Sequence, residues 1–324
     1  MPRIDRQRIA TAVRHLVAEL RRSRLLMGYM ALGILSGFGN GGPAGLIAAV
    51  LNYGLLALYG VIAFLWTEKD RRLVEPKHEM ATVASRRRAA TVIVVVVFAF
   101  AFGFAAWFWS HGLPFDVYWS VRHRLAGAGW NPALASKAAN AVVVSAETVV
   151  LFALAMLVFR LRPGQLGLLP RRIMLGLVLA AAGIVLAPLS RLLTGGTSLL
   201  WAGKLAIPIV LGILAFQVFS NGLPEEFIFR GIILSRLVGL LRRPASALVL
   251  SSILFTAVHI PSVLASGVLR GYPWWIVVPG LILTPGPEPT GLAWGYLFYR
   301  ARSIWPGVIW HTSASVLGCP FLGC

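Results

Sequence analysis

Long apolar runs are the feature of this sequence that most restricts its fold. Residues 44–66 contain no charged side chain, and residues 89–109 are built around an unbroken Val-Ile-Val-Val-Val-Val core. A helix needs roughly 20 apolar residues to cross a hydrocarbon layer about 30 Å thick. Both runs have that length, so they predict membrane-spanning α-helices.

Similar or shorter apolar runs continue to the C-terminus. The segment 273–302 is interrupted by TPGPEP at 284–289, so it is expected to form one broken span, two spans or a re-entrant piece. With the other runs the total is about eight spans, and the predicted fold is an all-α polytopic transmembrane helical bundle. The further candidate spans are residues 25–39, 141–159, 173–189, 205–220 with a second helical piece up to 240, 245–264 and 308–317.

The composition agrees with a membrane protein and excludes a soluble domain. Hydrophobic residues make up 58% of the chain and charged residues 13%, and the mean hydropathy is +0.78. A soluble globular chain carries about 25% charged residues. The formal net charge of +19 does not indicate nucleic-acid binding, because Lys and Arg stand in short blocks between apolar runs. The expected environment is the lipid bilayer, with no nucleic-acid partner.

The basic blocks also predict an orientation. Short cytoplasmic loops of membrane proteins are enriched in Lys and Arg, and such clusters fill the N-terminal segment before residue 25 and the linker after Trp66. Both are expected in the cytoplasm, with the loop 110–140 outside. The N-terminal segment is expected to be retained rather than cleaved as a signal peptide. The Ala- and Arg-rich composition favours a bacterial cell membrane as the location.

Ionisable residues inside apolar runs are expensive, at about 2.5 to 3.5 kcal/mol each on insertion scales, and therefore indicate pairing or function. The densest group lies in the sequence NGLPEEFIFR at 221–230. Pro224 and the acids can simply start a helix, and Glu226 and Arg230 have the spacing of a helical ion pair. That interpretation leaves Glu225 unexplained. A carboxylate in an apolar site is a candidate general base.

Two histidines lie in apolar runs that follow the acidic pair. His259 ends the sequence FTAVH and shares a helix face with Phe255, and His311 shares one with Ser315. Either histidine alone is more often a hydrogen-bonded interface residue than a catalyst. Their joint placement after the acids favours a shared site. The other four histidines fall in predicted loops or tails: His15, His78, His111 and His123.

In order and spacing, these motifs resemble those of the CPBP intramembrane proteases, also called the Abi or CAAX-protease type, which include the Rce1-like prenyl-protein endoproteases and bacteriocin-immunity homologues. The motifs are EExxxR beginning at Glu225, FxxxH ending at His259, and the run SIWPGVIW before His311. The resemblance begins near residue 160. Residues 160–324 are therefore expected to form the protease core, and residues 1–159 to be accessory transmembrane helices with a basic cytoplasmic tail and linker.

The resemblance implies a role for each motif residue. Glu225 and His259 would activate a water molecule as the nucleophile, and His311 would help to hold the oxyanion of the tetrahedral intermediate. Glu226 and Arg230 would support the site. The substrate would be a membrane-embedded or lipid-anchored peptide or protein. In a bacterium, another membrane or secreted peptide is expected rather than a prenylated protein.

The third motif departs from the family at one position. The family usually has Asn four residues after the last histidine, where this chain has Ser315. A serine hydroxyl is a shorter donor, and the loss of one oxyanion donor costs about 2.7 to 4 kcal/mol of barrier in other enzymes. Ser315 therefore bears on the activity and not on the fold.

The nature of the catalytic group is a second open question. The family has also been described as metalloproteases, and Glu225, His259 and His311 could supply a three-ligand zinc site with an open position. No HExxH helix is present. The metal-free glutamate mechanism is slightly favoured over the zinc alternative.

Two functions of other classes remain open. Glu147 belongs to no motif and is a candidate proton relay, so a proton- or ion-coupled transporter is one alternative. The more common role for such a residue is a hydrogen bond to a neighbouring helix. A catalytically inactive scaffold or bacteriocin-immunity protein is the other alternative, and Ser315 is its main evidence.

Overall fold

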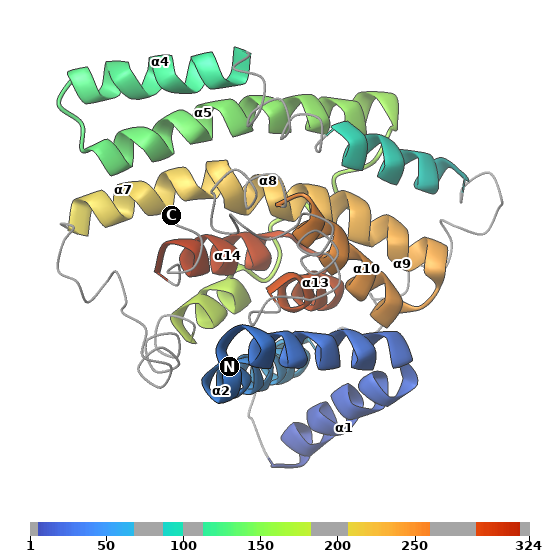
Figure 1. Ribbon diagram of the computed structural model, residues 1–324. Helices are drawn as coiled ribbons and strands as arrows, with labels where there is room; N and C mark the ends of the chain where they lie inside the picture. Colours follow the sequence, from blue (N-terminus) through green and yellow to red (C-terminus); the bar gives the residue numbers. More distant parts are fainter. Residues whose placement is uncertain (1–5, 68–86, 100–112, 183–206, 260–289, 318–324) are drawn as a thin grey trace. The chain divides into compact units, whose positions relative to one another are not determined.

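The computed structural model describes residues 6–67, 87–99, 113–182, 207–259 and 290–317 (Figure 1). Within these ranges every regular element is a helix, which confirms the predicted all-α class. The chain divides into two compact units, one formed by residues 1–93 and 232–302 and the other by residues 94–231 and 303–324. Each unit therefore combines segments that are distant in sequence.

The first unit is organised around a long helix near the N-terminus. Its elements are α1 (Arg6–Arg22), α2 (Arg24–Thr67), α9 (Ser235–Leu241), α10 (Pro244–Ala257) and α13 (Thr290–Ala301). Tyr29 of α2 donates a 3.2 Å hydrogen bond to Ser252 of α10. Arg300 of α13 donates a 2.8 Å hydrogen bond to Thr67 and lies over the ring of Phe64, 4.6 Å from its centroid. These contacts hold α2 against the later helices of this unit.

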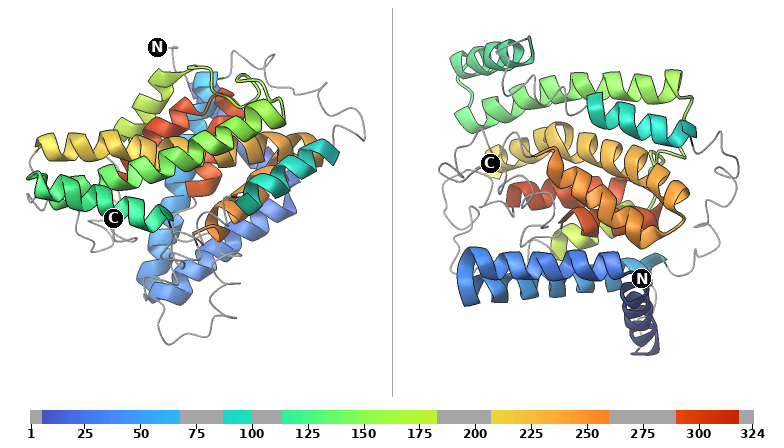
Figure 2. Two further views of the ribbon diagram at one scale, coloured as in Figure 1. Left: turned by 90° about the horizontal axis from the view of Figure 1, so that it is seen from above. Right: turned by 45° about the vertical axis from the view of Figure 1, so that its right-hand side comes forward.

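The second unit contains two long helices that lie side by side (Figures 1 and 2). They are α4 (Leu113–Gly127) and α5 (Pro132–Ala153), which continues as η2 (Leu154–Val158). Asn131 starts α5, because its side chain accepts hydrogen bonds from two backbone N–H groups of the first turn. Tyr118 and Ser136 join the two helices through a 2.7 Å hydrogen bond. Phe152 packs α5 onto the next element, with its ring centroid 5.7 Å from that of Phe227.

The acidic motif lies on one long helix, Ile207–Leu241. Its segments are α7 (Ile207–Gln217), η3 (Val218–Gly222), α8 (Leu223–Glu225), η4 (Glu226–Leu234) and α9, and both η segments have the wider π-helical hydrogen bonding. Pro224 lies inside this helix, where it offers no N–H and crowds the carbonyl four residues earlier. The helix widens to accommodate it, so that the N–H of Leu223 donates to Val218 O, five residues back. The run expected at 205–220, with a second helical piece up to 240, is thus observed as helical segments that follow one another from Ile207 to Leu241.

Three described helices are long and apolar enough to cross a membrane, judged by length and composition. They are Ala49–Thr67, Pro132–Val158 and Ile207–Leu241, and they confirm the spans expected at 44–66, 141–159 and 205–240. Shorter apolar helices occupy Arg24–Leu35, Ile173–Ala182 and Pro244–Ala257. The C-terminal halves of the candidates at 89–109 and 173–189, and most of 273–302, lie outside the described residues. The total of about eight spans stays a prediction.

Two other expectations about loops need correction. The predicted external loop 110–140 contains α4 and the start of α5, and the predicted N-terminal tail forms α1. His123 and His15 are consequently helical residues. The reason in α4 is a set of aromatic side chains on one face, where Trp119 stacks on His123 at 5.4 Å. Between the candidate spans 25–39 and 44–66, α2 consists of two helical segments that meet at a kink at Gly42, whose non-helical φ of 57° glycine adopts without strain.

Candidate active site

Four of the predicted site residues meet in the second unit. Glu225 and Glu226 lie at the junction of α8 and η4, and Arg230 follows one turn later in η4. His311 comes from α14 (Trp305–Leu317), which packs against η3. All four side chains are buried. In this unit, two carboxylates and one guanidinium from one helix therefore lie close to a histidine from another helix.

The ion pair expected from the helical spacing is confirmed. Arg230 Nη1 lies 3.3 Å from Glu226 Oε1, with side-chain exposures of 1% and 0%. A charge in such surroundings is stable only with a partner, because its desolvation cost is several kcal/mol. Glu226 and Arg230 therefore depend on each other for burial.

His311 lies between the two adjacent acids. Its Nδ1 is 3.1 Å from Glu226 Oε1, and its Nε2 is 3.6 Å from Glu225 Oε2. Neighbouring residues on a helix point about 100° apart, so one small side chain seldom reaches both. The imidazole ring does so because its two nitrogens face different directions. The sequence motifs did not predict this bridge.

The distances around His311 indicate which of its ring nitrogens donates a hydrogen bond. A carboxylate is acceptor-only, so His311 Nδ1 donates to Glu226 at 3.1 Å. The 3.6 Å separation between Nε2 and Glu225 Oε2 exceeds an ordinary hydrogen bond. Glu226 thus sets the orientation of the ring, while the Nε2 side faces Glu225 across a short gap.

Two glycines allow the helices to approach this closely. A Cβ at Gly307, one turn before His311, would lie 2.5 Å from Glu226 Oε2 and 3.0 Å from its Cδ. A Cβ at Gly222, one turn before Glu226, would collide with Thr312 Oγ1. Residues four apart share a helix face. The missed sequence signal was therefore a glycine four residues before Glu226 and another four residues before His311.

The segment 166–169 fixes the start of α14. Ile304 N–H donates to Gly167 O at 2.9 Å, and the Trp305 indole donates to Leu168 O at 2.8 Å. Ser303, fully buried, donates to Leu169 O at 2.9 Å. These bonds satisfy groups at the N-terminus of the helix. They join residues 166–169 to the N-terminal end of the helix that carries His311.

His259 belongs to the first unit and has a separate environment. Its Nδ1 lies 2.7 Å from Phe255 O, and because a carbonyl only accepts, Nδ1 donates this bond. In the neutral ring Nε2 then carries the lone pair. The rings of His259 and Phe255 are 4.8 Å apart, which confirms their predicted shared face. Its convergence with Glu225 and His311 stays a prediction.

Ser315 lies in α14, one turn after His311. Its backbone position agrees with the expected shared face, and its role as a donor stays a prediction. Glu147 lies in α5, in the same unit as the acidic cluster. One of its carboxyl oxygens, Oε1, is buried and has no hydrogen-bond partner among the described residues.

The described part of the chain contains no group of three or more His, Cys, Asp or Glu arranged to hold a metal ion. The zinc alternative requires Glu225, His259 and His311 together. Of these, the second unit supplies Glu225 and His311, whose facing atoms are 3.6 Å apart. The third ligand belongs to the first unit, so the zinc site stays a prediction.

Comparison with known proteins gives one match. Residues 206–317 match the family model described as type II CAAX prenyl endopeptidase Rce1-like. The matched range contains the acidic motif, His259 and His311. No curated protein and no solved structure matches the chain. The chain is an integral membrane protein, and its residues 206–317 are similar to the Rce1-like CAAX-protease family.

Proposed function

We propose that this protein is an intramembrane endopeptidase that hydrolyses a peptide bond with a water molecule activated by Glu225 and His259. The observation that carries the proposal is the buried cluster of Glu225, Glu226, Arg230 and His311 within the family-matched segment. Burying so many ionisable groups in an apolar helix pair is unfavourable unless they have a purpose. Packing alone is served better by apolar side chains of similar volume.

The two acids have different surroundings, which supports different roles. Glu226 Oε1 is engaged by Arg230 and by His311 Nδ1, so its negative charge is balanced within the fold. Glu225 Oε2 lies 3.6 Å from His311 Nε2, which is too long for a direct hydrogen bond. The two groups are close enough to contact the same reacting molecule. We assign Glu225 as the general base and Glu226 as a positioning residue.

The proposed reaction needs no covalent enzyme intermediate. Glu225, assisted by His259, takes a proton from water while the water oxygen attacks the carbonyl carbon. His311, as an imidazolium whose Nδ1–H is held by Glu226, donates its second N–H from Nε2 toward the developing oxyanion. The proton on Glu225 then passes to the leaving nitrogen as the peptide bond breaks. The products are an amine and a carboxylic acid, which ionises to a carboxylate as it releases the second proton of the water.

The substrate class follows from the family and from the burial of the site. The matched family is named for prenyl endopeptidases, whose substrates carry a lipid. The acidic motif of this chain lies within a helix long and apolar enough to span a membrane. We propose a lipid-anchored or membrane-embedded peptide as the substrate.

The direct test is cleavage by the purified full chain in detergent and in liposomes. A library of membrane-anchored peptides, each flanked by a fluorophore and a quencher, reports hydrolysis, and mass spectrometry of the products locates the broken bond. Glu225→Gln is the inactive control, and the soluble version of each peptide tests the need for a membrane anchor. Absence of cleavage by the parent across the library would contradict the proposal.

One observation favours a second candidate, a proton-coupled transporter. Glu147 Oε1 is buried in a span without a hydrogen-bond partner among the described residues. Such groups mark proton pathways in transporters. Proteoliposomes with an imposed pH gradient test this alternative. Solute uptake that is lost in Glu147→Gln and kept in Glu225→Gln would favour transport over hydrolysis.

A further inference from the structure

Helix α1 has one face that is packed against α2. Ala12 is fully buried with Phe64 and Leu65 of α2, and the ring of His15 lies 4.8 Å from that of Phe64. Leu16 approaches Gly60 closely enough that an added Cβ would be 3.4 Å away. These contacts all lie on one side of α1. The opposite side of α1 is therefore not covered by α2.

The uncovered side carries an apolar stripe. Ile9, Val13 and Val17 stand four residues apart and therefore share a face, and they are 41%, 44% and 39% exposed. Branched aliphatic side chains at regular spacing on an open helix face are typical of helices that lie on a membrane surface.

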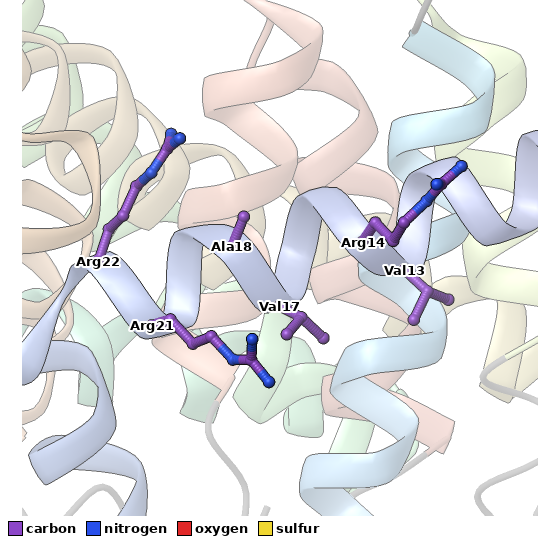
Figure 3. A pocket seen from close by; sticks show the side chains of 6 residues that line it. All are labelled: Val13, Arg14, Val17, Ala18, Arg21 and Arg22. Carbon is purple, nitrogen blue, oxygen red and sulfur yellow. The ribbon is translucent and has the colours of Figure 1, made fainter.

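Arginines stand beside this stripe. Arg14 and Arg21 are exposed and follow Val13 and Val17 along the same helix, so they flank the apolar stripe. Together with Ala18 and Arg22 these side chains line a shallow hollow (Figure 3). In Figure 3, Val13, Val17 and Arg21 extend to one side of the helix, and Arg14, Ala18 and Arg22 extend to the other.

The net positive charge of α1 indicates which kind of partner its exposed face can bind. Its single acid, Glu19, lies 3.8 Å from Arg22 on the same helix. Arg14 and Arg21 therefore give the stripe a net positive border. A surface that is apolar in the middle and cationic at the edge matches an anionic lipid, which offers acyl chain and headgroup in the same arrangement.

The position of α1 places the stripe near the edge of a bilayer. Its contacts with α2 fall at Gly60, Phe64 and Leu65, and the span Ala49–Thr67 ends two residues later. Helix α1 also runs at a steep angle to α2 rather than extending it (Figures 1 and 2). A helix that crosses the end of a span lies at the level of the lipid headgroups.

We propose that α1 is an interfacial helix whose exposed face binds anionic phospholipid, with Val13 and Val17 in the acyl boundary and Arg14 and Arg21 on the headgroups. The site would anchor the N-terminal helix to the membrane surface. It does not depend on peptidase activity, so either proposal can fail without the other.

The test uses the full chain in nanodiscs of phosphatidylcholine with increasing phosphatidylglycerol. A bimane probe is attached to Ala10→Cys, an exposed position on α1, in a background with Cys319→Ser and Cys324→Ser. We expect a blue shift of the probe as phosphatidylglycerol rises, because the stripe enters the lipid boundary. The double variant Arg14→Gln/Arg21→Gln should lower the ratio of docked to undocked α1 about 25-fold, since each basic side chain at an anionic surface contributes about fivefold.

Matched controls separate this site from general attraction. Arg242→Gln/Arg243→Gln removes the same charge from exposed positions outside α1 and should leave the shift unchanged. Val13→Ser/Val17→Ser should reduce the shift while all arginines remain. Inorganic phosphate at equal ionic strength should not compete, because it lacks acyl chains.

Three results would overturn the proposal. The first is an equal blue shift of the probe in pure phosphatidylcholine. The second is an equal loss of the blue shift in the Arg242→Gln/Arg243→Gln control. The third is displacement of α1 from the lipid by inorganic phosphate. Self-association in detergent that Val13→Ser/Val17→Ser abolishes would assign the stripe to a second copy of the chain. Unchanged melting of the Arg14/Arg21 variant excludes misfolding as the cause of a lost shift.

Discussion

His311 Nδ1 lies 3.1 Å from Glu226 Oε1, a contact between residues 85 positions apart in the chain. It joins α14 to the helix that carries the acidic motif. The same carboxylate oxygen lies 3.3 Å from Arg230 Nη1. Glu226 therefore holds a cation on its own helix and a histidine on another, and both the stability and the orientation of the site depend on it.

The first prediction separates the two acids. Glu225→Gln should abolish peptide cleavage with little change in melting temperature, because Glu225 is outside the Glu226–Arg230 ion pair. Glu226→Gln should lower both, because Arg230 then keeps a buried charge without its counter-ion. Thermal unfolding in detergent and cleavage assays measure the two effects. If Glu225→Gln unfolds while Glu226→Gln only loses activity, the roles are reversed.

The second prediction concerns the buried ion pair. Arg230→Met should destabilise the protein by about 3–5 kcal/mol, since removing one partner leaves a buried charge uncompensated. The double variant Glu226→Gln/Arg230→Met should recover part of that loss, because neither charge remains. Denaturant or thermal unfolding of the single and double variants gives the coupling free energy between Glu226 and Arg230. Arg124→Met, at an exposed position of α4, is the matched control and should be neutral.

The third prediction tests the close approach of the helices at Gly307. Gly307→Ala places a methyl group 2.5 Å from Glu226 Oε2, so α14 must move away and carry His311 with it. We expect a loss of about 1–3 kcal/mol in stability, as overpacking costs, together with reduced cleavage. Gly54→Ala is the control, because no atom lies within 4 Å of its added Cβ. That variant should be neutral or slightly stabilised.

The fourth prediction addresses the departure from the family pattern. If Ser315 donates to the oxyanion, Ser315→Ala should lower the catalytic rate about ten- to a thousandfold with little effect on stability, and Ser315→Asn should keep or raise it. Single-turnover kinetics on a cleaved peptide measures this. An Ala variant as fast as the parent would assign the oxyanion role to His311 or a backbone N–H instead.

The fifth prediction distinguishes the glutamate mechanism from the zinc alternative. If Glu225 and His259 activate water directly, a strong chelator should leave the cleavage rate unchanged, and elemental analysis of the active protein should find no stoichiometric metal. Activity that chelation removes and zinc restores would favour the metal mechanism, with Glu225, His259 and His311 as ligands.

The local pattern of the sequence predicted much of the site. Apolar length predicted three spans, because the thickness of a bilayer sets the number of residues that a helix needs. The spacing of Glu226 and Arg230 predicted their ion pair, because an α-helix brings such residues together. The order of the motifs predicted the family whose model matches residues 206–317.

Tertiary structure decided what local pattern does not contain. The helix continues through Pro224 with π-helical hydrogen bonding, in which the N–H of Leu223 donates to Val218 O. His311 bridges Glu225 and Glu226 because Gly307 lets two distant helices touch. A sequence shows which side chains lie together on one face of a helix. Whether two such faces touch depends on the distance between the helix backbones, and that distance is set only when the helices pack.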